Sequence, residues 1–300
     1  MDSSADIAEQ IFIHQCLQVF GFSFLVWDHI ISLEAEVRYI WAKAKSRSAC
    51  MFFFLRYFAL LGNISVNTLS FLNMSPQSCE DYGVYREFLL VFTQTVVCGI
   101  LTLRIYALYQ CKKKVLILMC VSACMMSSFV VWFLINQKST VSPVGSGTMV
   151  GCHLGTSHST AIRIASAWEA LFLYDTTLFL LTLIKTYRSR RQGVLKIDLL
   201  SLILRDGSIY FALMALANLS NILTFYFAPL YLRGGLSTFA TCVSVTMMSR
   251  LMLNLHESTD EGLYSTTVNF DTMIFVTNPP ASAEVVSFAF STIFEEDPWQ

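Results

Sequence analysis

The sequence predicts an all-α membrane protein in which seven transmembrane helices form a bundle, and three observations support this prediction. Of its 300 residues, 55% are hydrophobic and only 14% are charged, and the mean hydropathy is +0.56. A soluble domain carries about 25% charged residues, so this chain lacks the polar side chains that would cover it in water. The hydrophobic residues also gather in runs of about 20, the length that a helix needs to cross a bilayer.

This composition excludes a soluble globular enzyme, a nucleic-acid-binding protein and a disordered chain. The apolar runs are continuous and show no alternation of period two, which favours helices over a β-barrel. The first ten residues carry Asp2, Asp6 and Glu9 and no basic residue, which is the opposite of a cleavable signal peptide. The first apolar run is therefore expected to remain as a membrane helix.

Seven apolar runs are long enough to be membrane spans, although six or eight helices remain possible. The second, third and fourth runs are strongly apolar. The first is weakened by polar residues such as His14, Asp28 and His29, and the seventh is short and closely follows the sixth. The predicted spans are Ile11–Leu33, Met51–Leu72, Phe88–Tyr109, Val115–Ile135, Ile164–Ile184, Gly207–Leu232 and Leu236–Leu253.

The basic residues of the short loops predict the orientation of the bundle. Thirteen Lys and Arg residues fall in the loops on one side and four in the loops on the other. Basic loops face the cytoplasm, which puts the N-terminus outside and the C-terminus inside. We expect an extracellular or lumenal segment at 1–10, the transmembrane domain at 11–255 and a largely flexible cytoplasmic tail at 256–300. The last 50 residues hold eight Asp or Glu and no Lys or Arg, so this tail is acidic.

Two of the nine cysteines, Cys79 and Cys152, fall in loops predicted to be outside, where the environment is oxidising. They are either two free thiols or a disulfide that ties the loop before the third span to the loop after the fourth. Asn73 begins an Asn-Met-Ser glycosylation motif on the same side, very close to the end of the second span.

The first two predicted spans carry a recognisable pattern. It begins with Trp27-Asp28-His29, continues through Leu33-Glu34-Ala35-Glu36-Val37 and Ile40-Trp41, and ends at Arg56-Tyr57. This pattern resembles the N-terminal domain of unknown function of a large family of seven-helix proteins from basidiomycete fungi. The segment Leu103–Tyr109 is similar to a second hallmark of that family.

One segment departs from the family pattern. The loop Ala42–Ser48 reads Ala-Lys-Ala-Lys-Ser-Arg-Ser where the resemblance leads us to expect another Trp. The resemblance implies a seven-helix integral membrane protein. It implies no activity, because the family is functionally uncharacterised.

Four residues toward the cytoplasmic ends of the spans form a predicted inner polar layer: Asp28, Arg56, Arg104 and Tyr106. At 1.5 Å per residue, Asp28 and Arg56 both lie roughly 7–8 Å below the inner boundary, so they are a candidate ion pair between the first two helices. Such a pair either fixes helix packing or acts as a switch, and packing is the favoured interpretation. Arg250, near the inner end of the last span, is expected to extend toward the lipid headgroups.

Polar side chains also occur in the outer half of five spans, where they either line a ligand pocket or form hydrogen bonds between helices. Hydrogen bonding explains the acids Glu169 and Asp175 less well, because no basic residue in the spans lies at their depth. They are expected to be protonated or to face water. The candidate pocket residues, joined by hydroxyls of the seventh span, are Asn63, Asn67, Gln94, Glu169, Asp175, Asn218 and Asn221.

Three functions remain open. A receptor would bind a small apolar or amphipathic ligand in this pocket, with a heterotrimeric G protein as its candidate cytoplasmic partner. An enzyme of the fungal terpenoid cyclase type would use Glu169 and Asp175 as catalytic acids, although six residues place them about 120° apart around a helix. A transporter would show inverted repeats or broken helices, and the sequence shows neither. The receptor is the favoured reading.

The sequence contains no motif for a cofactor and no ligand spacing that predicts a metal site. The expected partner is the lipid bilayer, and no nucleic-acid partner is expected. The location is the plasma membrane or an endomembrane.

Overall fold

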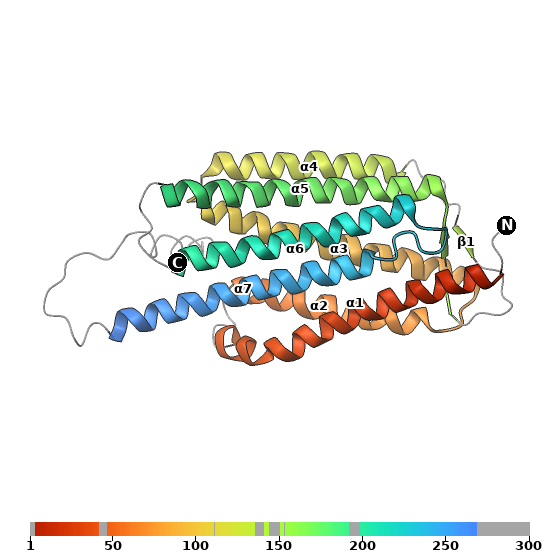
Figure 1. Ribbon diagram of the computed structural model, residues 1–300, viewed down its shortest axis with the longest axis horizontal. Helices are drawn as coiled ribbons and strands as arrows, with labels where there is room; N and C mark the ends of the chain where they lie inside the picture. Colours follow the sequence, from red (N-terminus) through yellow and green to blue (C-terminus); the bar gives the residue numbers. More distant parts are fainter. Residues whose placement is uncertain are drawn as a thin grey trace, which may run out of the picture.

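The computed structural model describes residues 4–41, 47–110, 112–135, 141–143, 151–152, 154–191 and 199–268, and seven helices occupy most of them. They run along a common long axis (Figure 1). Two three-residue strands, β1 (Val141–Pro143) and β2 (Leu154–Thr156), pair antiparallel between the fourth and fifth helices. Apart from these strands the fold is all-α, as predicted. The helices are α1 (Ser4–Tyr39), α2 (Arg47–Ser70), α3 (Pro76–Leu108), α4 (Lys113–Ile135), α5 (His158–Arg191), α6 (Leu199–Phe227) and α7 (Ser237–Val268).

Five of the helices, α1, α2, α3, α5 and α6, are long and apolar enough to cross a membrane. Large hydrophobic side chains lie exposed on their outer faces, among them Trp27 at 62%, Ile30 at 63% and Leu216 at 59%. Exposed apolar surface of this extent is unfavourable in water and suited to lipid. The chain is therefore a helical membrane protein.

The two ends of the bundle carry different parts of the chain. The strands β1 and β2 lie at the end where α1 begins, which we call the hairpin end (Figure 1). Helix α7 ends at the opposite end, which we call the tail end.

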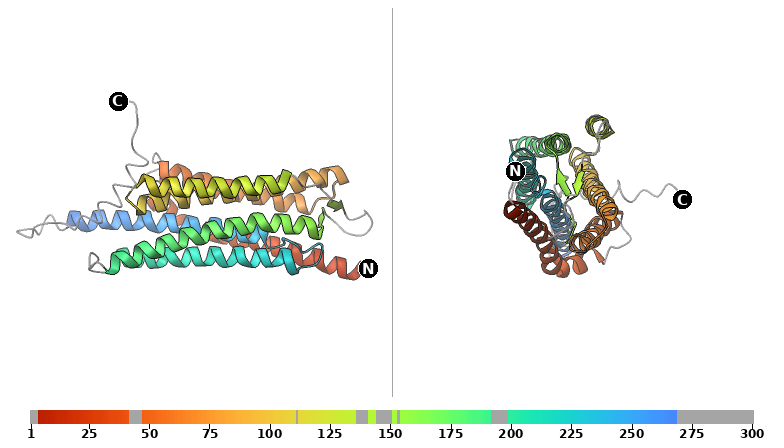
Figure 2. Two further views of the ribbon diagram at one scale, coloured as in Figure 1. Left: turned by 90° about the horizontal axis from the view of Figure 1, so that it is seen from above. Right: turned by 90° about the vertical axis from the view of Figure 1, so that its right-hand side faces the viewer.

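Helix α7 lies inside the ring of the other helices (Figure 2, right). It packs against α1, α2, α3 and α6, and nearly every side chain from Ser237 to Leu253 is buried. None of the exposed large hydrophobic side chains among the described residues belongs to α7. Because the Ser237–Leu253 part of α7 meets mostly protein, it can carry many hydroxyl groups, and α7 is not among the helices apolar enough to be candidate spans.

Local sequence signals explain where several helices begin and end. Ser75 caps α3, with its hydroxyl accepting a 3.3 Å hydrogen bond from the Ser78 amide, and Pro76 follows at the first helical position. Helix α6 ends at Phe227, before the predicted Leu232, because Pro229 cannot continue the helix. Ser75 and Pro76 lie outside the predicted apolar runs, and Pro229 lies inside the sixth run, where the apolar residues around it extend the run beyond the end of the helix.

Helix α7 starts after a turn in which Gly234 has a φ of +69°, a conformation that favours glycine. The helix continues to Val268, so the segment predicted as a flexible tail begins as helix. The remainder of that predicted tail, residues 269–300, lies outside the described residues.

Candidate functional site

Four charged side chains from three helices meet inside the tail half of the bundle, and we call Asp28, Glu36, Arg56 and Arg250 the charge cluster. Arg56 Nε lies 3.0 Å from Glu36 Oε2, and Arg56 Nη1 lies 3.8 Å from Asp28 Oδ2. Arg250 Nε approaches Asp28 Oδ1 to 2.6 Å. The side chains of Arg56 and Glu36 are 0% exposed and that of Asp28 is 3% exposed. Two positive and two negative groups thus join α1, α2 and α7.

Neutral donors satisfy Glu36 from the other side. The Tyr57 hydroxyl donates to Glu36 Oε1 at 2.8 Å, and Trp41 Nε1 donates to the same oxygen at 3.1 Å. Glu36 is therefore paired with the Arg56 guanidinium through one oxygen and hydrogen-bonded through the other. A buried carboxylate is tolerated in an apolar interior only when it is paired and hydrogen-bonded in this way.

Arg56 is similarly surrounded. Its Nη2 donates to Ser32 Oγ at 2.7 Å and to the His29 carbonyl oxygen at 3.2 Å. The Phe52 ring lies 5.5 Å from the guanidinium carbon, a distance at which a cation interacts with an aromatic face. These contacts hold the guanidinium plane between α1 and α2, where it faces both carboxylates.

The sequence placed Glu36 among the few acids near the inner basic residues, but the partners of Glu36 and Arg250 were not foreseen. The predicted first span ended at Leu33, which left Glu36 in a loop, whereas α1 continues to Tyr39 and carries Glu36 two turns beyond Asp28. The spacing of eight residues, one face of a helix, was the available signal. Arg250 was expected to extend toward lipid headgroups, and instead it pairs with Asp28.

The other two residues of the predicted inner polar layer lie apart from this cluster. Arg104 and Tyr106 are half-buried on α3 near the tail end. Among the described residues, neither forms an ion pair or hydrogen bond with the charge cluster.

A further buried carboxylate, Asp175 of α5, forms no ion pair within the described part of the chain. Asn218 Nδ2 of α6 donates to Asp175 Oδ2 at 3.0 Å, and Cys98 Sγ of α3 lies 3.9 Å from Oδ1. Asp175 is 6% exposed and Asn218 is 0% exposed. Beside them, the hydroxyls of Thr102 and Tyr174 share a 2.6 Å hydrogen bond. Hydrogen bonds rather than ion pairs therefore connect α3, α5 and α6 at this depth.

Three other predicted pocket residues have partners of their own. Nδ2 of Asn63 and Nδ2 of Asn67 each donate, at 2.8 Å, to a carbonyl one turn back on α2. Cys242 Sγ of α7 lies 3.7 Å from Asn63 Oδ1, and the Ser237 hydroxyl of α7 donates to Asn221 Oδ1 at 3.1 Å. Asn63 and Asn221 thus connect α2 and α6 to the central helix.

Among the described residues, the remaining two predicted pocket residues, Gln94 and Glu169, form no hydrogen bond with Asp175. Glu169 Oε1 accepts a 2.6 Å hydrogen bond from Tyr226, one residue before the end of α6 at Phe227. Glu169 is therefore near the hairpin end rather than deep in the bundle. Gln94 is 6% exposed on α3.

Polar contacts of α7 run along the length of the bundle. At the hairpin end Arg86 Nη2 of α3 donates to Thr238 Oγ1 at 3.3 Å. At the tail end Asn254 Nδ2 donates to the Tyr210 hydroxyl at 2.8 Å. With the contacts of Ser237, Cys242 and Arg250, they connect α7 to α1, α2, α3 and α6.

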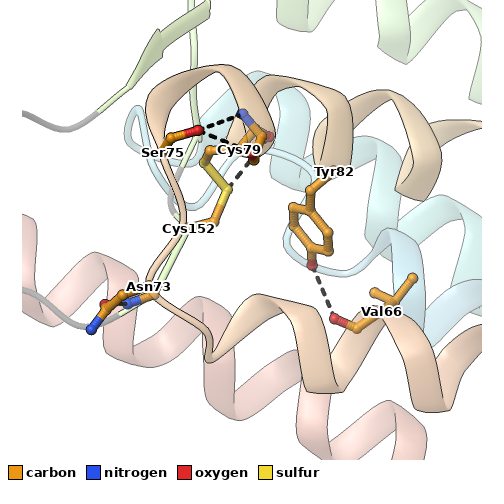
Figure 3. The surroundings of a disulfide bond; sticks show 8 residues. Val66, Asn73, Ser75, Cys79, Tyr82 and Cys152 are labelled. Atoms are coloured by element: carbon orange, nitrogen blue, oxygen red, sulfur yellow. Dashed lines mark hydrogen bonds between the residues drawn. A yellow bond between two sulfur atoms is a disulfide. The ribbon is translucent and has the colours of Figure 1, made fainter.

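The hairpin end is covalently joined to α3. A disulfide connects Cys79, in the first turn of α3, to Cys152, which lies just before β2 (Figure 3). Close to it, the Gly151 amide donates to Asn73 Oδ1 at 3.1 Å, and this holds the start of the glycosylation motif beside the bridge. Within the described residues, no group of three or more His, Cys, Asp or Glu side chains could hold a metal ion.

The fold and the charge cluster define a helical membrane protein whose first two helices are joined by buried ion pairs. Residues 16–61 match the model of a family described as "Family of unknown function (DUF6533)". This confirms the expectation of a domain of unknown function in the N-terminal part of the chain. The matched segment holds Asp28, Glu36 and Arg56, and only Arg250 of the charge cluster lies beyond it. No curated protein and no solved structure matches the chain.

Proposed function

We propose that this protein is a seven-span membrane receptor with its N-terminus outside and its tail in the cytoplasm. The orientation rests on the thirteen basic residues in the loops of the tail end, against four in those of the hairpin end. In this proposal α4 and α7 complete the set of spans. Helix α7 needs less hydrophobicity than a lipid-facing helix because the other helices surround it.

The observation that carries the proposal is the central position of α7. This helix is bonded near the hairpin end to α3 and α6 and near the tail end to α1. A ligand that displaces the hairpin-end contacts of α7 would change the energy of its tail-end contacts, because both belong to one rigid helix. Coupling between two distant sites through such an element is the physical basis of transmembrane signalling.

The ligand side of the proposed receptor is the outer half, where Asn63, Asn221 and Asp175 place polar groups among apolar side chains. A small apolar or amphipathic ligand fits this chemistry. The enzyme alternative receives less support, because Glu169 and Asp175 bond to different residues. The cytoplasmic partner is a heterotrimeric G protein, which would bind the basic tail end.

A topology experiment tests the architecture. A glycosylation tag at the N-terminus and a protease site after Val268 are introduced into the full chain, and both are read in sealed microsomes. We expect a glycosylated N-terminus and a protease site that is cleaved from the cytosolic side. Two ends on the same side would mean an even number of spans and would overturn the proposal.

Signalling is tested through the tail-end contact of α7. We expect Arg250→Gln, which removes the Asp28 contact, to raise ligand-independent nucleotide exchange on purified G protein above the wild-type rate. The control is Arg233→Gln, which changes an arginine in the α6–α7 turn at the other end. Equal exchange by the wild type and both variants, at the level of G protein alone, would contradict a receptor role.

A further inference from the structure

Asn73 lies on the connection between α2 and α3, and its side chain is exposed (Figure 3). It begins one of three Asn-x-Ser motifs in the sequence, the pattern at which glycans are attached to secreted and membrane proteins. The other two begin at Asn63 and Asn218, which are 4% and 0% exposed inside the bundle. A glycan on either of these would not fit the fold, so Asn73 alone of the three asparagines has room for one.

The first turns of α3 carry Asn73 away from the apolar part of the bundle. Helix α3 has 33 residues, whereas about 20 apolar residues span the hydrocarbon core. Its predicted apolar run begins at Phe88, so Pro76–Glu87 form an extension of roughly 18 Å. Exposed charges on this extension, such as Glu80 and Asp81, require water rather than lipid. Asn73 precedes the extension and therefore lies beyond the hydrocarbon, although it follows the predicted second span directly.

A separate small hydrophobic core holds this extension against the end of α2. Its buried members are Val66, Cys79, Tyr82, Leu89 and Cys152. The disulfide lies within this core, and the Tyr82 hydroxyl donates to the Val66 carbonyl at 3.3 Å. Met74, the middle residue of the motif, packs against the same core, whereas Asn73 and Ser75 on either side are exposed. The fold thus presents both ends of the motif to the outside.

The hydrogen bonding of Asn73 leaves free the atom that would carry a glycan. The Gly151 amide donates to Asn73 Oδ1 at 3.1 Å, whereas Nδ2 forms no hydrogen bond among the described residues. N-linked glycans are attached through Nδ2, and the carbonyl oxygen remains an acceptor. The Gly151 contact and a glycan are therefore compatible on one side chain.

We propose that Asn73 carries an N-linked glycan. The sugar donor is a lipid-linked oligosaccharide diphosphate. A bond forms between Asn73 Nδ2 and the anomeric carbon of the first sugar, while the bond from that carbon to the diphosphate breaks. The lipid diphosphate leaves with the electron pair, and Nδ2 loses one proton to solvent. The inference rests on the orientation in the proposed function, which places the hairpin end outside, but not on receptor activity.

The test compares variants of the motif in the full chain, which also carries a glycosylation tag at its N-terminus. Ser75→Thr keeps the hydroxyl that the motif requires and Ser75→Asp removes it, while both replacements can cap α3. Each protein is made in the presence of sealed microsomes, and its gel mobility is compared before and after an amidase removes N-linked glycans. We expect the wild type and Ser75→Thr to carry the tag glycan and a second glycan. Ser75→Asp and Asn73→Gln should carry the tag glycan alone.

The tag separates the failure of this inference from a failure of the proposed orientation. A wild type that carries the tag glycan without a second glycan overturns the inference and leaves the orientation standing. A wild type with no glycan at all places the hairpin end in the cytosol and overturns both. A second glycan that persists in Asn73→Gln also overturns the inference, because it lies on another residue. The transfer acts on the newly made chain, so the comparison does not depend on how stably each variant folds.

Discussion

Charged side chains inside the bundle are paired on one side of it and unpaired on the other. Between α1, α2 and α7, every member of the charge cluster faces a group of opposite sign within 4 Å. Between α3, α5 and α6, the buried Asp175 and the half-buried Arg104 form no ion pair among the described residues. Cys98, which contacts Asp175, precedes Arg104 by six positions on α3, so the two charges lie roughly 9 Å apart along the helix axis.

This difference separates structural charge from charge that is available for binding. A closed set of ion pairs is already satisfied, so it fixes the packing of the helices that contribute to it. An unpaired buried charge retains its cost until a ligand, an ion or a proton removes it. We therefore expect substitutions in the charge cluster to lower stability strongly and substitution of the unpaired Asp175 by a neutral amide to change stability little.

The largest effect is expected for Arg56→Met, which leaves the buried Glu36 without a charged partner and Asp28 with Arg250 alone. Uncompensated buried charge costs about 3–5 kcal/mol, so the variant should unfold at much lower temperature or fail to accumulate. Thermal unfolding in detergent measures the change. The double variant Arg56→Met with Glu36→Met should recover part of the loss. If the double variant is as unstable as the single variant, ion pairing is not the cause.

The next largest effect is expected on removing the disulfide that joins α3 to the segment just before β2. Cys79 and Cys152 are separated by 73 residues, so removing the bridge frees a long loop in the unfolded chain. Cys79→Ser with Cys152→Ser should lose about 2–4 kcal/mol of stability. Unfolding with and without reductant checks this, since reductant should destabilise the wild type and leave the double variant unchanged. A reductant-insensitive wild type would contradict the prediction.

A smaller loss is expected for Arg250→Gln. The Arg250 side chain is 39% exposed, so water replaces part of its contact with Asp28, which keeps Arg56 at 3.8 Å. We expect a loss of about 1–2 kcal/mol. Arg250→Lys retains the charge and should lose less in the same unfolding experiment. A loss as large as that of Arg56→Met would show that Arg250, rather than Arg56, is the main partner of Asp28.

The smallest effect is expected for Asp175→Asn. Because Asp175 has no ion-pair partner among the described residues, the substitution removes a buried acid and preserves an amide that can bond to Asn218. The change in stability should be about 0–1 kcal/mol in either direction, the scale of a single hydrogen bond between membrane helices. A loss near that of Arg56→Met would break the comparison, because it would require an opposite charge near Asp175. Asp175→Leu, which has no hydrogen-bonding groups, should lose more than Asp175→Asn.

Much of the architecture could be predicted because hydrophobicity is a property of each segment. The apolar runs correctly indicated a helical membrane protein, and five of the helices meet the criteria for a span. The depth of Asp28 and Arg56 could be estimated from helix rise alone. The role of Glu36 was missed because the first span was ended at its last apolar residue, whereas the helix continues beyond it.

By itself, the sequence determined the membrane class, the helical content and the distribution of basic residues among the loops, because each follows from local composition. Only the tertiary structure decided that α7 lies in the centre of the bundle and that Arg250 reaches Asp28, 222 positions away in the chain. It also decided which buried charges lack a partner. The physical reason is that the cost of a buried charge depends on its neighbours from other helices, and a single segment does not contain that information.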